Sequence, residues 1–341
     1  MDYLVSIIIP VYKVEAYIER CLTSVMGQTY HESPIECILV DDCSPDNSIA
    51  IAEKLIATYN GIIDFKIIRN EVNGGISVAR NRGLEQATGK YIFFLDSDDH
   101  LTEDCLQVLL GALTECPDTE VVLGNCYDQR TSAPYIDFNH NHQILLDNSQ
   151  LLKAFYMGKF PMIAWNALIL RELITKNQIS FMPRLVHEDN LWTFELYSHV
   201  NRFIFIPQIT LIYENNPTSI MNTIGVNAVK DLPHQIIIMD ELLNSFDDTH
   251  TVEYTLFLAS FLFKMLDQSK YCDQSLRVKV ESQRDRLLKH SIRRGRIILV
   301  LYQLWMYSPL SRLFRYKYVR HNFHRLTKVT YAIASFLDFL H

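Results

Sequence analysis

The first half of the chain alternates between two patterns of apolar residues. Continuous apolar runs rich in β-branched residues are typical of strands buried in a parallel sheet, and they occur at 4–9, 35–40, 65–68, 91–95 and 120–124. Between these runs apolar residues recur at helical spacing, which predicts helices at 18–25, 46–59, 75–87 and 103–113. Strands that alternate with helices of this length form right-handed βαβ units. The pattern therefore predicts an α/β fold, with an open, mostly parallel sheet and helices on both faces.

The pattern changes after about residue 125. The elements predicted next are a helix and two strands, at 151–157, 164–170 and 203–213. Helices with many aromatic residues follow a break at 215–227, which contains Pro217 and Gly225. We therefore expect one domain at 1–220 and a helical, basic and aromatic C-terminal extension at 221–341.

Charge is unevenly distributed along the chain. The formal net charge is −7, yet the stretch from Leu287 to Leu337 contains ten basic residues and no acidic ones. These basic residues are Lys289, Arg293, Arg294, Arg296, Arg312, Arg315, Lys317, Arg320, Arg325 and Lys328. A basic, aromatic segment of this kind can lie on an anionic membrane surface. The alternatives are a helical subdomain packed on the first domain, or a dimer contact.

The remaining composition narrows the class of protein. There are seven cysteines and no CxxC pair, which argues against a disulfide framework or a structural zinc site. No apolar run approaches the roughly 20 residues that span a bilayer, and the N-terminus lacks a signal-peptide pattern. No nucleic-acid-binding module is recognisable. These features predict a cytoplasmic protein. Its basic segment could place it peripherally on the inner face of the cell membrane.

Carboxylates follow two of the predicted strands. Asp41–Asp42 comes directly after the second strand, and Asp96, Asp98 and Asp99 follow the fourth. In open α/β sheets, ligands bind at the carboxyl ends of the strands. Carboxylates this close repel one another, and a hard cation such as Mg²⁺ or Mn²⁺, shared with substrate phosphates, would hold them together. The alternative for both motifs is a solvated turn that caps the next helix.

Two further motifs stand at the starts of predicted helices. Asn73 and Gly74 begin the helix that carries Arg80, and a glycine turn there lets the backbone approach a phosphate. Glu188 and Asp189 precede an apolar, aromatic stretch, and a carboxylate held at a helix start can act as a general base towards a hydroxyl. A simple loop and ordinary helix capping are the alternatives.

Taken together and in this order, these segments resemble the large family-2 glycosyltransferases. The motifs that carry the resemblance are Ser6–Tyr12, Ile38–Asp42, Asn73–Gly75, Ala79–Gly83, Phe94–Asp99, Ala164–Asn166 and His187–Asp189. The resemblance covers roughly residues 4–215. It implies a GT-A fold and an inverting transfer of a sugar from a nucleoside-diphosphate sugar to a hydroxyl acceptor. It also implies a role in the synthesis of a cell-surface polysaccharide or glycolipid.

The resemblance further implies roles on the nucleotide side of the site. Pro10 would line the nucleobase pocket, and Asp42 would contact the base or the ribose with help from Asp41. The remaining candidates for donor binding are Asn73, Gly74 and Arg80.

Around the reacting atoms, the resemblance implies three functions. Asp96 would face the ribose or the donor sugar. Asp98 would ligate the Mg²⁺ or Mn²⁺ bound to the diphosphate, with Asp99 as support. Asp189 would be the catalytic base, with Glu188 beside it. A displacement at the anomeric carbon needs both an activated acceptor oxygen and a stabilised leaving group.

On the acceptor side, Trp165 lies in a motif that resembles the family pattern. Many members carry Lys or Arg two residues after this Trp, whereas Ala167 stands here. A contact from this position to an acceptor phosphate is therefore not expected. The acceptor itself is predicted to be a saccharide or a lipid-linked saccharide.

Three other classes of protein compete with a glycosyltransferase. A non-catalytic protein that binds sugar nucleotides, or a scaffold, would have lost the carboxylates at Asp96, Asp98 and Asp189, which are all present. A nucleotidyltransferase would more typically have a Gly-rich, basic loop after the first strand. A glycoside hydrolase would explain two facing carboxylates but not the nucleotide-type α/β start.

Overall fold

The structure is a computed structural model that describes residues 3–137, 144–217, 220–245 and 252–293. The chain divides into two compact units. The first unit contains Met1–Leu152 and Phe160–Ser219, and the second contains Lys153–Lys159 and Ile220–His341. The second unit thus takes a short segment from the middle of the chain, which the sequence pattern did not predict.

The described residues of the first unit form one ten-stranded sheet. Its strands are β1 (Val5–Val11), β2 (Ile35–Asp41), β3 (Ile63–Arg69), β4 (Tyr91–Phe94), β5 (His100–Leu101), β6 (Val121–Asp128), β7 (Ala133–Pro134), β8 (Ile144–Asp147), β9 (Ala167–Leu170) and β10 (Arg202–Tyr213). They follow the order β3-β2-β1-β4-β9-β6-β10-β5, with β7 beside β6 and β8 beside β10.

The predicted parallel core of the sheet is present. Strands β3, β2, β1 and β4 pair in parallel, as do β6 and β10. Strand β9 lies antiparallel between β4 and β6 and joins the two parallel groups. The two central strands β1 and β2 are buried along their whole length, because both faces of this part of the sheet are covered.

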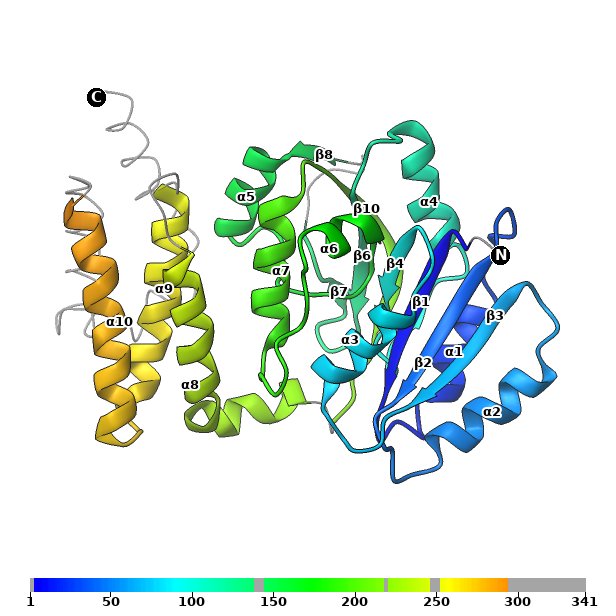
Figure 1. Cartoon of the computed structure of the whole chain (residues 1–341), viewed down its shortest axis with the longest axis horizontal. Coiled ribbons are helices and arrows are strands. Elements are labelled where there is room, and N and C mark those ends of the chain that lie inside the picture. Colours follow the sequence, from blue (N-terminus) through cyan, green and yellow to red (C-terminus); the bar gives the residue numbers. More distant parts are fainter. Residues whose placement is uncertain (1–2, 138–143, 218–219, 246–251, 294–341) are drawn as a thin grey trace. The chain divides into compact units, whose positions relative to one another are not determined.

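Helices cover both faces of the sheet, as predicted. Those of the first unit are α1 (Ile18–Met26), α2 (Ser48–Thr58), α3 (Ile76–Gln86), α4 (Cys105–Glu115), α6 (Arg171–Lys176) and α7 (Glu188–His199). Helices α1 and α2 contact each other, and α3 packs on β1 and β2. Figure 1 shows α3 in front of the sheet and α1 behind it. The chain reverses its direction along the sheet between β3 and β4, and a right-handed crossover then places α3 on the opposite face.

Two element boundaries differ from the sequence prediction for physical reasons. The first strand continues through Pro10 to Val11 rather than ending before the proline. Strand β1 pairs with β4 only as far as Ile8, so the missing N–H of Pro10 interrupts no ladder on that side. The strand predicted at 164–170 begins only at Ala167, because Asn166 has a φ of 61° and turns the chain.

The second unit is helical where it is described. Its helices are α8 (Ile220–Asn244), α9 (Val252–Ser269) and α10 (Gln274–Arg293), and α5 (Asn148–Tyr156) enters it from the first unit. The buried side chain of Gln283 donates to the backbone oxygen of Ile236 at 2.8 Å and ties α10 to α8. The rings of Phe155 and Phe257 lie 5.6 Å apart and hold the short middle segment against α9. The predicted helical extension is thus present as far as Arg293. The basic tail beyond it lies outside the described residues.

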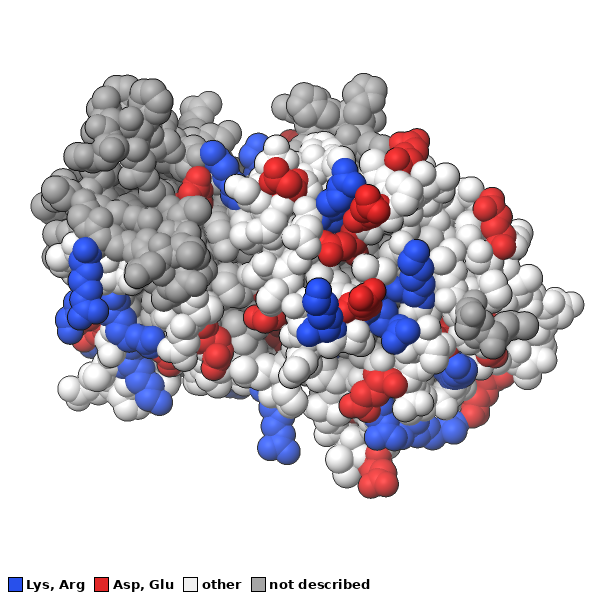
Figure 2. All heavy atoms as spheres, turned by 45° about the horizontal axis from the view of Figure 1, so that its top comes forward, with Lys and Arg blue, Asp and Glu red and all other residues white. Residues whose placement is uncertain are grey.

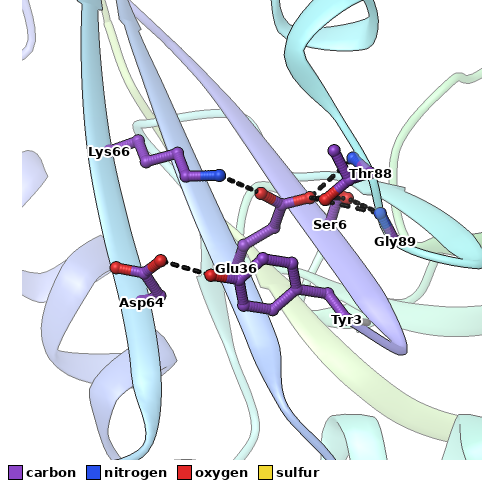
Figure 3. A network of polar contacts seen from close by, with 7 residues as sticks. All are labelled: Tyr3, Ser6, Glu36, Asp64, Lys66, Thr88 and Gly89. Atoms are coloured by element: carbon purple, nitrogen blue, oxygen red, sulfur yellow. Dashed lines mark hydrogen bonds and ion pairs between the residues drawn. The ribbon is translucent and has the colours of Figure 1, made fainter. Parts of the chain in front are cut away.

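A buried carboxylate stabilises the amino end of the sheet (Figure 3). Glu36, the second residue of β2, is fully buried and accepts hydrogen bonds from Lys66 Nζ at 2.7 Å and Ser6 Oγ at 2.6 Å. The backbone and hydroxyl of Thr88 and the amide of Gly89 complete its shell. Burial raises the pKa of this carboxyl, but the hydrogen bonds from Lys66, Ser6 and Thr88 outweigh it and lower the pKa to about 2.

Two features of the structure concern nucleic acid and the membrane as possible partners: the distribution of charge on the surface and the apolarity of the helices. On the face seen in Figure 2, acidic and basic side chains of the first unit are interspersed, unlike the continuous basic stripe of a nucleic-acid-binding surface. Within the described ranges, no helix combines the length and the apolarity that a membrane span requires. All seven cysteines lie in described segments and carry free thiols.

Candidate active site

The carboxyl edge of the sheet brings together side chains from distant parts of the chain. Strand β4 ends at Phe94, two residues before Asp96. The backbone amide of Leu95 donates to the oxygen of Ile8 at 3.0 Å, which extends the pairing with β1 up to the carboxylate. The side chain of Asp96 is 21% exposed and therefore borders solvent at the open edge of the sheet.

Arg80 is the centre of this cluster. It lies on α3, its side chain is 1% exposed, and its guanidinium contacts three carboxylates. Nη2 donates to Asp96 Oδ1 at 2.8 Å, while Nη1 donates to Glu188 Oε1 at 2.9 Å and to Asp189 Oδ1 at 2.7 Å. The ring of Phe181 lies 5.1 Å from the guanidinium carbon. Arg80, a predicted donor-binding residue, joins the two sides of the site through these contacts, and its contact with a nucleotide sugar stays a prediction.

The start of α7 supplies two of these carboxylates. Glu188 and Asp189 form its first turn, after His187 turns the chain with a φ of 64°. Acidic residues are favourable there because the helix dipole is positive at its N-terminus. Helix α7 is anchored by Trp192, whose ring stacks on Phe181 at 4.0 Å between centroids. The structure places both candidate carboxylates, Glu188 and Asp189, in the first turn of this helix.

One guanidinium does not balance three carboxylates. Burial raises the pKa of Asp189 to about 7, with Arg80 opposing and the charges of Glu188 and Asp96 adding to the rise. The pKa of Glu188 is raised too, mainly by burial. A carboxylate whose pKa lies near neutrality is suited to accept a proton from a hydroxyl at neutral pH.

Asp98 and Asp99 form a second acidic group at the same edge. Asp98 accepts a hydrogen bond from Asn216 Nδ2 at 2.9 Å, and Asp99 accepts one from the backbone amide of Glu214 at 2.9 Å. Burial and the charge of Asp96 raise the pKa of Asp98, and burial and the charge of Asp98 raise that of Asp99. Asp99 Oδ2 is buried without a hydrogen-bond partner. This group thus carries more negative charge than its neighbours compensate.

Glu214 extends the acidic group beyond the motif. Its Oε1 lies 3.1 Å from Arg20 Nη1 and 3.2 Å from His100 Nδ1, and it accepts a hydrogen bond from Gln129 at 3.0 Å. Burial and the nearby Arg20 lower the pKa of His100. The carboxylate of Glu214 is therefore already paired with its own partners, while its backbone amide donates a hydrogen bond to Asp99.

The chemistry of the acidic group fits a divalent cation that takes part of its ligands from elsewhere. Among the described residues, no set of three or more His, Cys, Asp or Glu side chains is arranged as a metal cage. The uncompensated charge on Asp98 and the orphaned Oδ2 of Asp99 would both be relieved by a cation. Mg²⁺ typically uses one or two protein carboxylates and completes its shell with water and substrate phosphates. The donor set fits that mode of binding.

The Asp41–Asp42 motif lies at the end of β2. Asp42 is 2% exposed, and its carboxylate accepts hydrogen bonds from the amides of Gly74 and Gly75 and from Asn70 Nδ2, each at 2.8 Å. Gly75 has a φ of 82°, which a side chain would strain. Asp42 therefore shapes the glycine turn before α3, and its contact with a base or ribose stays a prediction.

The remaining donor-side candidates lie around this turn. Asn73 Nδ2 donates to the backbone oxygen of Asp42 at 3.0 Å. Asp41 Oδ1 accepts from the amide of Ser44 at 2.8 Å, within the turn that follows β2. Pro10 is buried in β1 opposite Val40. The structure thus places Pro10 and Asp41 at the ends of the neighbouring strands β1 and β2, and Asn73 in the loop between β3 and α3. Their contacts with a nucleotide stay predictions.

Trp165 belongs to an aromatic group on the other side of the edge. Its ring stacks on that of Tyr213, with centroids 5.4 Å apart and planes 8° apart. The next residue, Asn166, donates its amide to the oxygen of Phe94 at 3.3 Å, so Trp165 lies close to the end of β4. Trp165 is 5% exposed. Its ring can support a neighbour but presents little surface of its own.

Sequence reasoning missed several residues of this edge. Glu214 and Asn216 were included in or next to the predicted domain break, although they directly follow a strand. The rule that identified Asp96, namely polar residues just past an apolar strand, also applies to them. Tyr135 and Tyr213 gave no comparable signal, because isolated aromatic residues are common in protein cores.

The sequence matches the family described as glycosyl transferase family 2 over residues 6–177. The chain belongs to this family. It is 30% identical over 222 residues to the uncharacterized glycosyltransferase YibD of Escherichia coli, a match that covers 63% of this chain and 62% of YibD. It is 27% identical over 282 residues to the poly(ribitol-phosphate) beta-N-acetylglucosaminyltransferase TarS of Staphylococcus aureus, covering 82% of this chain and 47% of TarS. The chain thus spans less than two thirds of the length of either relative.

A solved structure supports the family fold. The chain matches an N-terminal fragment of Staphylococcus aureus TarS in complex with UDP-GlcNAc, with a TM-score of 0.63 and 25% identity, over 84% of this chain and 79% of that fragment. The predicted GT-A fold with a helical C-terminal region is thereby confirmed. The family match at 6–177 ends before Glu188 and Asp189. The family match therefore does not cover these two candidate residues. Their place in the site is shown by their hydrogen bonds with Arg80.

Proposed function

We propose that this chain is an inverting glycosyltransferase that moves a sugar from a nucleoside-diphosphate sugar to a hydroxyl acceptor. The observation that carries the proposal is the three-way contact of Arg80. One buried guanidinium holds the donor-side carboxylate Asp96 and the carboxylate Asp189 in one site, although these residues are far apart in sequence. Membership of family 2 and the similarity to a UDP-GlcNAc complex support a nucleotide-sugar donor.

Each carboxylate has a distinct task in this proposal. Asp189 accepts the proton of the acceptor hydroxyl as the hydroxyl oxygen attacks the anomeric carbon. Arg80 holds Oδ1 of Asp189 in place and binds Glu188 beside it. Asp96 faces the ribose or the donor sugar. Asp98, with Asp99 in support, would hold a Mg²⁺ or Mn²⁺ ion, and this ion would supply positive charge to the departing diphosphate.

The two units have separate tasks as well. We propose that the first unit, up to about residue 220, catalyses transfer, and that the C-terminal extension provides a peripheral contact with the inner face of the cell membrane. The setting is cytoplasmic synthesis of a cell-surface polysaccharide or glycolipid, with a saccharide or lipid-linked saccharide as the acceptor. Eight of the ten basic residues that support the membrane contact lie beyond Arg293, outside the described residues. Salt-sensitive sedimentation with anionic vesicles, lost on neutral vesicles, would test it.

The experiment that tests the function is thermal unfolding of the purified chain with UDP, GDP, dTDP and CDP, each with and without Mn²⁺. A ligand at a hundred times its Kd stabilises the folded state by about 2.7 kcal/mol. We expect a metal-dependent rise in Tm with one of the four nucleotides. A folded sample that responds to none of them would contradict the proposal.

Turnover then separates the enzyme from a non-catalytic binding protein or scaffold. With the sugar nucleotide chosen by the thermal screen, the enzyme should release nucleoside diphosphate, and faster when an acceptor is added. A protein with a decayed site would bind the nucleotide and release none. Glu195 is an exposed acid on the same helix as Asp189. Glu195→Gln is therefore the matched control for a substitution of Asp189, and it should retain activity.

A further inference from the structure

An aromatic platform lies beside the carboxylates and has no task in the proposed chemistry. It consists of Tyr135, Trp165 and Tyr213. Trp165 and Tyr213 are stacked, and the ring of Tyr135 lies 6.1 Å from Trp165 at 65° and 6.3 Å from Tyr213 at 57°. Aromatic groups in this geometry stabilise one another beyond their buried area. The platform is therefore a rigid unit.

The three rings come from separate parts of the fold. Tyr213 is the last residue of β10, Trp165 precedes β9, and Tyr135 follows the short hairpin of β6 and β7. The amide of Tyr135 donates to the oxygen of Cys126 at 2.8 Å, which fixes this residue to β6. Its position thus depends on the strand edge rather than on a free loop.

The exposed fractions of the three rings show which of them can contact a ligand. Tyr135 is 38% exposed, whereas Trp165 is 5% exposed. Tyr213 is intermediate in exposure. A large aromatic side chain that remains exposed while two less exposed rings pack against it is a surface on which the C–H face of a sugar ring can stack. Trp165 and Tyr213 are the supports, and Tyr135 presents the free surface.

The platform lies within reach of both sides of the site. The residue after Tyr213 is Glu214, whose backbone amide donates to Asp99 Oδ1 at 2.9 Å. On the other side, Thr193 Oγ1, one helical turn after Asp189 on α7, donates to the backbone oxygen of Ile163 at 3.2 Å, two residues before Trp165. The platform therefore adjoins both the acidic group and the helix that carries Asp189.

The cation on the platform is already neutralised. The guanidinium carbon of Arg130 lies 4.5 Å from the centroid of the Tyr213 ring. Arg130 also donates to both oxygens of Asp128, from Nε at 3.0 Å and from Nη2 at 2.9 Å. A bidentate pair of this kind satisfies the charge of both partners. Arg130 therefore stiffens the platform and does not offer a free positive charge to an anionic ligand.

We propose that Tyr135, supported by Trp165 and Tyr213, is the acceptor subsite and that it takes an uncharged pyranose ring rather than an alditol phosphate. This assignment rests on the proposed glycosyltransferase function and specifies its acceptor. A pyranose offers a flat C–H face to an aromatic ring. An open-chain alditol phosphate has no such face and brings a negative charge towards Asp189.

The test compares acceptors and variants with the sugar nucleotide that the chain hydrolyses. Octyl pyranosides of glucose, galactose and N-acetylglucosamine are compared with poly(ribitol phosphate), in the wild type and in Tyr135→Ala. We expect at least one pyranoside to accelerate donor turnover, and Tyr135→Ala to raise its KM by about tenfold. The KM for the donor and the hydrolysis of donor without acceptor should stay unchanged.

Two further variants separate stacking from structure. Tyr135→Phe keeps the ring and should retain the wild-type acceptor KM, since the hydroxyl is not required for stacking. Tyr271→Ala removes a 77% exposed ring in the second unit and serves as the matched control. A Tm close to that of the wild type confirms that Tyr135→Ala is folded.

The failures of the two proposals are distinguishable. Absence of nucleotide binding and donor turnover in the wild type would contradict the proposed function itself. With donor turnover intact, three results would overturn the acceptor subsite. These are an unchanged acceptor KM in Tyr135→Ala, a preference for poly(ribitol phosphate), and failure of every pyranoside to accelerate turnover.

Discussion

The two ends of the central sheet treat buried carboxylates in opposite ways. At the amino end, Glu36 receives hydrogen bonds from Lys66, Ser6 and the segment after α3, and its pKa falls to about 2 (Figure 3). At the carboxyl end, Arg80 is shared among three carboxylates, and the pKa of Asp189 rises to about 7. Glu36 is fully buried whereas the Asp189 side chain is 20% exposed, so the degree of exposure does not explain why Asp189 has the higher pKa.

The supply of hydrogen-bond donors makes the difference. Glu36 has an ammonium, two hydroxyls and two backbone amides to itself, so its ionised form is stable when buried. The carboxylates near Arg80 have fewer donors than they need, and an added cation or an added proton would lower their energy. Under-compensation of this kind is found at sites that bind or react, and it costs stability.

The largest expected effect comes from Asp189→Asn. We expect kcat to fall by about 10²- to 10⁴-fold, since an amide cannot accept the proton of the acceptor hydroxyl. Nucleotide binding should be nearly unchanged, and thermal stability should be equal or higher, because the change removes a negative charge from an overloaded cluster. Donor turnover and Tm are measured together. Near-normal turnover would show that Asp189 is not the base.

Glu36→Gln is the opposite experiment. The carboxyl pKa falls from 4.5 to about 2, which corresponds to about 3 kcal/mol of stability at neutral pH. Replacing Glu36 should lower the unfolding free energy in urea by about that amount and leave kcat unchanged. Asp64→Asn, which changes the exposed partner of Tyr3 in the same network, should cost less than about 1 kcal/mol. Equal losses in the two variants would contradict the account of Glu36.

The same pKa fixes the pH range of this stability. A lowered pKa means that the folded state prefers the ionised carboxylate. The contribution of Glu36 is therefore fully present above about pH 4.5 and is lost as the pH falls through about 2. The difference in stability between wild type and Glu36→Gln should shrink over this interval, and this is measured by urea unfolding at a series of pH values.

The raised pKa of Asp189 predicts an acid limb in the rate. The base must be ionised, so kcat/KM should fall about tenfold per pH unit below about pH 7. This differs from an ordinary aspartate, whose limb would lie near pH 4. A rate profile between pH 5 and 9, with a check that the protein stays folded, measures it. A flat profile down to pH 5 would exclude a base with a raised pKa.

The sequence was sufficient for the parts of this comparison that depend on local patterns. Apolar runs that stop at Asp41–Asp42 or at Asp96 identify both a strand and the edge at which it ends. The contact of Arg80 with Asp189 could not be predicted, because it depends on how α3 and α7 meet, and no local periodicity encodes that. The environment of Glu36 was equally hidden, since its donors come from three neighbouring segments.

The place of β9 shows the same limit. A short apolar run indicates a strand but not its partners, and β9 pairs antiparallel with both β4 and β6. This insertion brings Trp165 beside the end of β4. Asn216 fell within the predicted break at 215–227, and Glu214 directly preceded it, because turn-forming residues follow them. In the fold they complete the acidic edge.

The smallest expected effect sharpens the comparison within the acidic edge itself. Asn216 donates one hydrogen bond to Asp98 and lies beside the exposed Asn215, which makes no contact with that carboxylate in the described structure. Asn216→Ala should weaken Mn²⁺-dependent nucleotide binding by about fivefold, which corresponds to the roughly 1 kcal/mol of a single hydrogen bond. Asn215→Ala should leave it unchanged. Titration calorimetry with the nucleotide at fixed Mn²⁺ distinguishes them. If the two variants bind equally well, then Asp98 does not depend on Asn216 for its orientation. A shortage of hydrogen-bond donors would then matter less for the carboxylates of the acidic edge than for those around Arg80.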